Sequence, residues 1–147
     1  MAFLLSCSET LEPKPNEFAK IFSSETSKTW LIRSIQLREE GKSTQTFGLP
    51  PCLGDDEYIF YANLEKTFEV SNGSSKCNAD EPDVLVSDSW EFSNANATMK
   101  IILPLFSDNK LPFFVRSVDD KEMELEIFLD EKNTSSYRIN FKAKDQK

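Results

Sequence analysis

The chain has 147 residues, the size of one domain, and a formal net charge of −8 at pH 7. That charge repels phosphate backbones and anionic membrane surfaces, so we expect no binding of nucleic acid through a basic patch. The sequence contains no histidine, which removes the commonest general base, the usual metal ligand and every Ser-His or Cys-His nucleophile. We therefore predict a protein that is not an enzyme and that uses no metal ion or cofactor.

The first residues form a short apolar run that ends in Leu-Leu-Ser-Cys and then turns polar. Leu4, Ser6 and Cys7 make this segment similar to the lipobox of bacterial lipoproteins, and the resemblance implies lipidation of Cys7. A signal peptide has a basic region and an apolar region of about 7 to 15 residues, whereas six residues precede Cys7. Two alternatives stay open: the start is truncated or misplaced, or the match is chance and the cysteine is incidental.

Residues 8–15 contain two prolines and several polar residues, which is typical of a tether. We predict a signal remnant and tether over residues 1–15 and one domain over residues 16–147. Asn16 is a suitable N-cap for a helix over residues 17–23. Phe18, Ile21 and Phe22 would then share one face at helical spacing, and we expect this helix to plug one end of a sheet.

Alternating apolar and polar residues predict eight strands in the rest of the chain. The predicted strands cover residues 28–39, 57–62, 67–71, 90–93, 99–103, 113–118, 123–129 and 137–144. No helix long enough for a parallel crossover separates them, so neighbours should pair antiparallel as a meander. In the first strand, Trp30 and Ile32 face one side and Ile35 and Leu37 the other, so a bulge near Ser34 is needed to turn all four inward.

Two connections are predicted to be irregular. Residues 78–87 are mostly acidic and polar around a small apolar patch at residues 84–86, and residues 48–51 read Gly-Leu-Pro-Pro. The longest apolar run, near residues 101–106, is far shorter than the roughly 20 residues of a spanning helix. We therefore expect contact with a membrane only through a lipid on Cys7.

Cys52 and Cys77 flank the hairpin of residues 57–62 and 67–71. If Cys7 is lipidated, they are the only cysteines left to pair, and a lipoprotein matures outside the cytoplasm, where disulfides persist. We predict a disulfide between them. The alternative is two unrelated buried thiols.

Three acidic clusters could be calcium ligands or a general acid and base pair: Asp55 to Glu57, Asp80 to Asp83, and Asp119 with Asp120. None has the spacing of a known calcium loop. Each lies in a predicted turn, where aspartate is favoured for its hydrogen bonds to nearby backbone. We therefore predict turn residues here, with no metal site and no catalytic residue.

A set of large apolar residues on the inward face admits two interpretations. The residues are Trp30, Ile32, Tyr58, Phe60, Phe68, Trp90 and Phe92. They fill the interior of a small barrel, or they line a cavity for one small apolar ligand.

The span from Lys28 to Lys144 resembles the lipocalin-like domains found as small lipoproteins of Gram-negative bacteria. The residues that carry this resemblance are Trp30, Cys52, Asp55-Asp56, Tyr58-x-Phe60, Asn72-Gly73, Cys77 and Trp90-x-Phe92. Lys28 departs from the pattern, because typical lipocalins have glycine there. The resemblance implies an all-β, eight-stranded antiparallel up-and-down barrel of the calycin type with a short N-terminal helix and no catalytic residues.

We therefore predict an extracytoplasmic protein, lipid-anchored in the bacterial outer membrane, that binds a small hydrophobic ligand in a lipocalin-like barrel. The alternative is a protein-interaction or inhibitor module with a solid barrel core and no small-molecule ligand. A hydrolase acting through paired carboxylates is the third and least favoured hypothesis.

Overall fold

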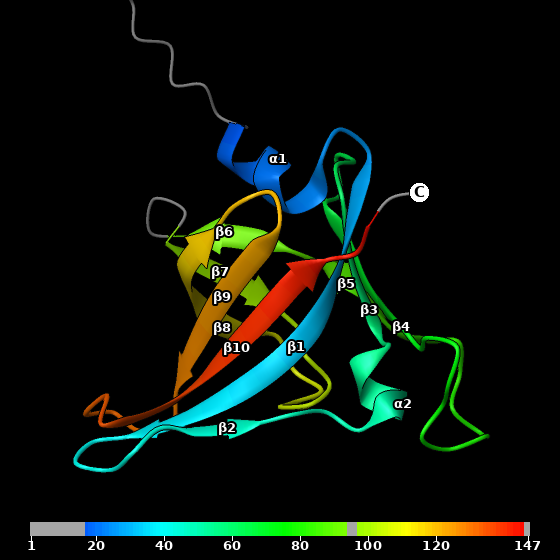
Figure 1. Cartoon of the computed structure of the whole chain (residues 1–147). Helices are drawn as coiled ribbons and strands as arrows, with labels where there is room; N and C mark the ends of the chain where they lie inside the picture. The colour runs from blue at the N-terminus through cyan, green and yellow to red at the C-terminus, as the bar shows by residue number, and fades with distance from the viewer. Residues whose placement is uncertain (1–16, 94–96, 146–147) are drawn as a thin grey trace, which may run out of the picture.

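The computed structural model describes residues 17–93 and 97–145, which form an all-β, nearly closed antiparallel barrel (Figure 1). Two short helices accompany the strands. The elements in chain order are α1 (Glu17–Ser23), β1 (Ser27–Glu39), β2 (Gln45–Phe47), α2 (Pro51–Gly54), β3 (Glu57–Tyr61), β4 (Thr67–Ser71), β5 (Val84–Ser89), β6 (Glu91–Ser93), β7 (Thr98–Ile101), β8 (Leu111–Val118), β9 (Glu122–Phe128) and β10 (Ser135–Ala143). Neither helix in these two ranges is long and apolar enough to cross a bilayer.

The strands follow a cyclic meander. Nine of them form one path in the order β5-β4-β3-β1-β10-β9-β8-β7-β6, and β2 pairs with β1 outside it. Every pairing is antiparallel, and β1 and β10, the first and last strands, pair over most of their lengths. The two ends of the path, β5 and β6, are separated along the chain by Trp90 alone. The backbone N–H of Trp90 donates to the carbonyl of Lys66 at 2.9 Å. The chain therefore nearly closes the barrel by bending at Trp90.

The predicted count of eight strands is wrong, because the described residues contain nine strands along the path and ten in all. The two additional strands are β5 and β2. Residues 84–89 were predicted to lie mostly in a polar connection, and none of them is buried. All three residues of β2 are exposed. Both strands therefore lack the alternation of burial that identifies a half-buried strand, and their backbone pairing with β4 and β1 alone defines them.

Two local predictions are confirmed. The predicted helix is α1, which lies over one end of the barrel in Figure 1, with Phe22 fully buried; Asn16, its predicted N-cap, lies outside the described residues. The register between β1 and β10 shifts between Ile32 and Ser34. Through this bulge Ile35 turns to the same side as Ile32 and packs against the core, whereas Leu37, which was predicted to turn inward too, is half-buried and is not among the residues that pack against the core.

The core is one cluster that draws on every wall of the barrel and on α1. Its buried apolar members are Phe22, Trp30, Ile32, Tyr58, Phe60, Phe68, Val70, Trp90, Met99, Ile101, Leu103, Phe113, Met123, Leu125, Ile139 and Phe141. Burial of each large apolar side chain stabilises the fold by about 1.5 to 3 kcal/mol. The core is thus aromatic at the α1 end and more aliphatic where β7, β8 and β9 meet.

Candidate functional site

The seven residues predicted to face inward do lie together inside the barrel. Six of them are at most 3% exposed, and Phe92 is partly buried. Their rings contact one another: Phe60 lies 4.9 Å from Phe68 and 5.5 Å from Trp90, and Trp90 lies 5.4 Å from Phe92, all in edge-on geometry. These are ordinary contact distances between aromatic centroids, so no ligand can lie between these pairs.

Helix α1 adds a further ring to this group. Phe22 lies 4.9 Å from Phe92 and 6.2 Å from Phe60, measured between ring centroids. The two indole N–H groups are also satisfied: Trp30 donates to the Phe22 carbonyl at 3.0 Å, and Trp90 donates to the Tyr61 carbonyl at 3.1 Å. The Trp30 hydrogen bond therefore ties the plug helix to the aromatic core in addition to packing, whereas the Trp90 hydrogen bond is made to β3.

An apolar groove of about 350 Å³ lies at the rim of the barrel, and the sequence did not single it out. Its lining comes from β1, β2, β10 and the segment between β7 and β8. The lining residues are Ile35, Phe47, Leu105, Phe106 and Tyr137. Phe47 pairs with Ile35 across β1 and β2, and the Phe106 ring lies 5.5 Å from the Tyr137 ring. Phe47 keeps 46% of its surface exposed, so the groove is open to solvent.

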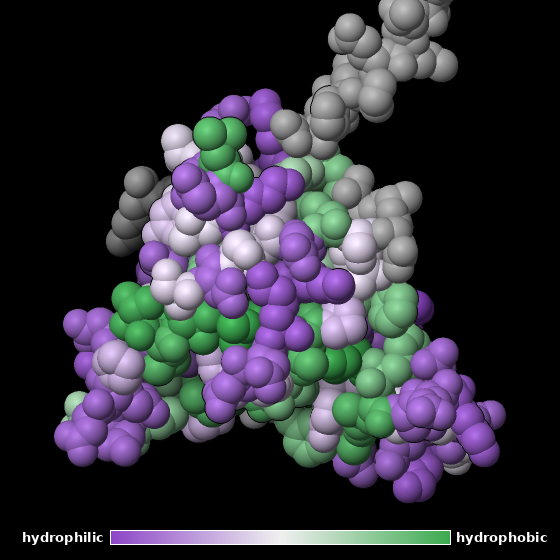
Figure 2. All heavy atoms as spheres, turned by 180° about the vertical axis from the view of Figure 1, so that it is seen from behind, coloured by the Kyte–Doolittle hydropathy of each residue, from purple (hydrophilic) through white to green (hydrophobic). Residues whose placement is uncertain are grey.

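Apolar surface is not confined to this groove. Figure 2 shows hydrophobic residues gathered in a band across the side of the molecule that faces away from the viewer in Figure 1. The large exposed apolar residues of the described ranges are Phe47, Leu64, Val84, Phe114 and Leu129. These five residues lie on β2, on the connection between β3 and β4, on β5, on β8 and just after β9, and single exposed apolar residues of this kind are ordinary on protein surfaces.

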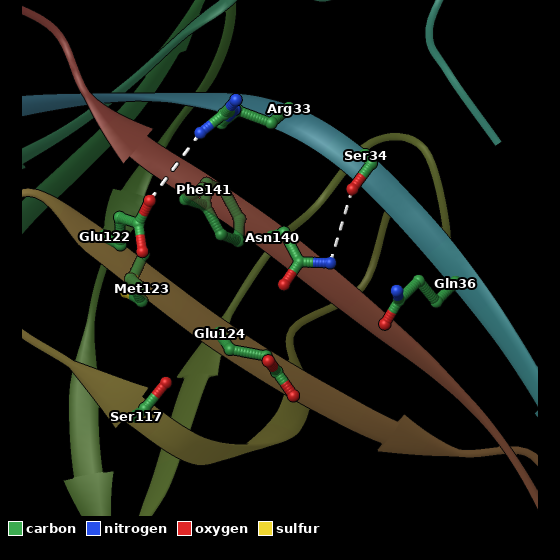
Figure 3. A pocket seen from close by; sticks show the side chains of 9 residues that line it. All are labelled: Arg33, Ser34, Gln36, Ser117, Glu122, Met123, Glu124, Asn140 and Phe141. Atoms are coloured by element: carbon green, nitrogen blue, oxygen red, sulfur yellow. Dashed lines mark hydrogen bonds and ion pairs between the residues drawn. The ribbon is translucent and has the colours of Figure 1, made fainter. Parts of the chain in front are cut away.

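A polar trough of about 420 Å³ follows the outer wall of β8, β9, β10 and β1 (Figure 3). Arg33 pairs with Glu122 at 3.6 Å, and the Asn140 amide donates to the Ser34 hydroxyl at 3.3 Å. Gln36, Ser117 and Glu124 complete its polar lining. With no histidine in the chain, the serine hydroxyls here have no imidazole base beside them.

The predicted disulfide between Cys52 and Cys77 is present and joins α2 to the connection after β4. It closes a loop with a sequence separation of 25 residues, which on loop-entropy reasoning corresponds to about 3 kcal/mol of stabilisation. Beside it, one carboxylate oxygen of Asp55 accepts hydrogen bonds from the Ser75 N–H at 2.9 Å and from the Ser74 and Ser75 hydroxyls at 3.0 and 2.8 Å. Asp55 is thus a turn residue that holds two segments together.

The cluster of Asp119 and Asp120 also acts in a turn. Asp119 accepts hydrogen bonds from the N–H groups of Lys121 and Glu122, both at 2.8 Å. In the cluster of Asp80 to Asp83, the backbone N–H of Asp80 donates to the Asn78 side chain at 3.2 Å, and the Asp83 carboxylate forms an ion pair with Lys76 at 2.7 Å. Within the described ranges, no group of three or more acidic or cysteine side chains is arranged to hold a metal ion.

We expect Gly73→Ala to lower the free energy of unfolding by about 2 kcal/mol, because a new methyl group would overpack a filled site. A Cβ at Gly73 would lie 2.2 Å from the Asp55 carbonyl oxygen, which belongs to the backbone and cannot swing aside. Gly48→Ala is the matched control, since a Cβ there meets no atom within 4 Å. Urea denaturation of both variants checks this, and equal stability of the two would contradict it.

No protein-family model matches the chain, and no curated protein matches its sequence. The resemblance to lipocalin-like domains therefore stays a prediction that rests on the residues quoted above. Cys7 and the tether over residues 1–15 lie outside the described residues, so lipidation stays a prediction as well.

Proposed function

We propose that this protein binds a small hydrophobic ligand in the rim groove. The ligand therefore lies at the mouth of the barrel and not among the seven residues predicted to line a cavity. The observation that carries the proposal is the groove itself, in which apolar side chains from four separate segments converge and Phe47 is left half exposed.

The groove has the features of a small-molecule site. Its volume of about 350 Å³ falls within the range of ligand pockets, about 300 to 1,000 Å³, and such pockets are lined mainly by apolar and aromatic side chains. Among its five lining residues, Tyr137 alone carries a polar side-chain atom. A compact ligand with an apolar body and one hydrogen-bonding group fits this lining best.

A binding experiment with matched variants tests the proposal. We expect a fluorescent fatty acid to bind the wild-type protein, and Phe47→Ser to weaken that binding about tenfold, because loss of a large buried contact costs roughly 1.4 kcal/mol or more. Val84→Ser is the control, since Val84 is as exposed as Phe47, at 46%, but lies on β5 away from the groove. Equal loss in both variants, or unchanged affinity in Phe47→Ser, would refute the rim site.

The disulfide supports an extracytoplasmic location, because such bonds persist in oxidising compartments. We propose that a lipid on Cys7 holds the protein at the bacterial outer membrane. Mass spectrometry of the protein isolated from membranes tests this: an acylated N-terminal Cys7 is expected, and an unmodified Cys7 within an intact N-terminus would refute it.

The close ring contacts inside the barrel support a second candidate function, a protein-interaction module that carries no small molecule. Under this hypothesis the groove is part of a contact surface. Failure of any fatty acid or other apolar probe to bind a correctly folded protein would favour it over the first candidate.

A further inference from the structure

The outer wall of the barrel carries a buried carboxylate. Carboxylates on an outer wall are usually exposed to solvent. Glu126 lies on β9, where it is paired with Arg138 on β10 and with Phe114 on β8. Its neighbours along the strand, Leu125 and Ile127, belong to the inner face, so by alternation Glu126 belongs to the outer face. It is nevertheless only 1% exposed. Side chains on the outside must therefore cover it.

Arginine side chains provide much of this cover. One oxygen of Glu126 accepts hydrogen bonds from Arg138 Nε at 2.7 Å and from the Ser136 hydroxyl at 3.0 Å, and Arg38 Nη1 lies 3.5 Å from the same oxygen. Arg116 Nη1 lies 3.5 Å from the other oxygen. Burial works to raise the pKa of Glu126, but the hydrogen bonds and arginine charges hold it below its usual value. Glu126 is thus a carboxylate that draws three guanidinium groups together.

This arrangement leaves positive charge facing solvent. Arg138 has a second partner, Glu124 at 3.4 Å, whereas within the described residues Arg38 and Arg116 form ion pairs with Glu126 alone. Their side chains are 44% and 47% exposed, and each guanidinium has five N–H donors, most of which Glu126 leaves free. Three arginines against two glutamates give a local charge of +1 in a chain of net charge −8.

An exposed aromatic ring, its half-buried aromatic neighbour and a hollow adjoin the arginines. Phe114, which is 42% exposed, lies edge-on to Phe128 with 5.5 Å between ring centroids. A hollow of about 420 Å³, with Arg38 and Phe128 in its lining, opens beside them between the segments at residues 38–44 and 132–136. Arginine and aromatic residues side by side are the composition of energetically dominant positions in protein interfaces.

We propose that the arginine cluster of Arg38, Arg116 and Arg138, together with Phe114 and Phe128, is a docking surface for an acidic segment of a partner protein. Carboxylates of that segment bind the free donors of Arg38 and Arg116, whose geometry suits two parallel hydrogen bonds. An apolar side chain next to them packs on the Phe114 ring. An acidic segment is the partner that complements this site in charge, because the arginine cluster is cationic in a chain of net charge −8. The proposal does not depend on the rim groove.

Two short synthetic peptides test this inference, one of alternating glutamate and phenylalanine and one with glutamine in place of each glutamate. Calorimetric titration is expected to show about tenfold tighter binding of the glutamate peptide, because charge-assisted hydrogen bonds to arginine are about twice as strong as neutral ones. The double variant Arg38→Ala with Arg116→Ala should lose this preference. Arg33→Ala should keep it, since Arg33 is also exposed on this wall but pairs with Glu122.

Equal binding of the two peptides, no binding of the glutamate peptide, or the same loss in Arg33→Ala as in the double variant would overturn the proposal. A second double variant, Arg38→Lys with Arg116→Lys, covers the case in which the alanine variant fails to fold. It keeps both charges but cannot form paired hydrogen bonds, so an affinity between those of the wild type and the glutamine control is expected. Unchanged affinity in this lysine variant would also count against the docking surface.

Discussion

Phe60→Ala is expected to lower the free energy of unfolding by about 4 kcal/mol, as for other buried phenylalanines in solid cores. Phe60 is fully buried, and its ring contacts those of Phe22, Phe68 and Trp90. In a filled interior, truncation removes all of these contacts and leaves a cavity that the rigid barrel wall cannot collapse. Urea denaturation, followed by tryptophan fluorescence and by circular dichroism, measures the loss.

The size of this loss separates a solid barrel from a hollow one. If Phe60 bordered a ligand cavity or internal water, its ring would have fewer protein contacts, and truncation would cost clearly less than the roughly 3 to 5 kcal/mol of a close-packed phenylalanine. Leu64→Ala is the control, since Leu64 is 99% exposed in the connection between β3 and β4 and should change stability by less than about 0.5 kcal/mol. If Phe60→Ala lowered the free energy of unfolding only slightly, the barrel interior would again be the better candidate for the ligand site.

Stability should also fall as the pH rises from about 4 to about 6, because of Asp56. This residue is 3% exposed, and one of its carboxylate oxygens has no hydrogen-bond partner among the described residues. Burial, assisted by the charges of Asp55 and Glu81, raises the pKa of Asp56 to about 6, although a backbone hydrogen bond from Gly73 opposes the change. The folded protein therefore holds the proton more tightly than the unfolded chain, whose aspartates titrate near about 3.9.

The sign of the effect follows from this difference. Below pH 4 the Asp56 carboxyl is protonated in the folded and the unfolded state, so its ionisation does not affect the free energy of unfolding. Above pH 6 the folded state must bury a charged carboxylate, which destabilises it. The free energy of unfolding loses up to about 3 kcal/mol across this window, since two pKa units correspond to about 2.7 kcal/mol. Other carboxylates respond oppositely at lower pH, so wild type and Asp56→Asn are compared at each pH.

Asp56→Asn should be more stable than wild type at pH 7.5 and should not show this loss between pH 4 and 6. The gain is smaller than the full cost of ionisation, because one amide atom occupies the unpartnered position. Asp55→Asn provides the contrast: hydrogen bonds from Ser74 and Ser75 overcome the effect of burial and lower the pKa of Asp55, so this variant should lose stability at neutral pH. Parallel pH profiles for wild type and Asp56→Asn would contradict the prediction.

Prediction from sequence succeeded where a local pattern reports burial. Alternation identified the inner residues of β3, β4 and β10, helical spacing identified α1, and a parity conflict located the bulge near Ser34. It failed for β5, whose residues are all at least partly exposed. A strand of this kind is held by backbone hydrogen bonds to β4. Every residue type except proline can form these bonds, so they cannot be recognised from the sequence.

The sequence by itself determined an all-β chain with one aromatic inner face, a pair of cysteines placed to clamp a hairpin, and no histidine for catalysis or metal binding. Only the tertiary structure decided how the rings of that face pack against one another, because ring-to-ring distances depend on barrel curvature and on the position of α1. The rim groove and the Glu126 cluster arise from residues that are distant in sequence and adjacent across strands. Such neighbours are set by strand register, which no local pattern encodes.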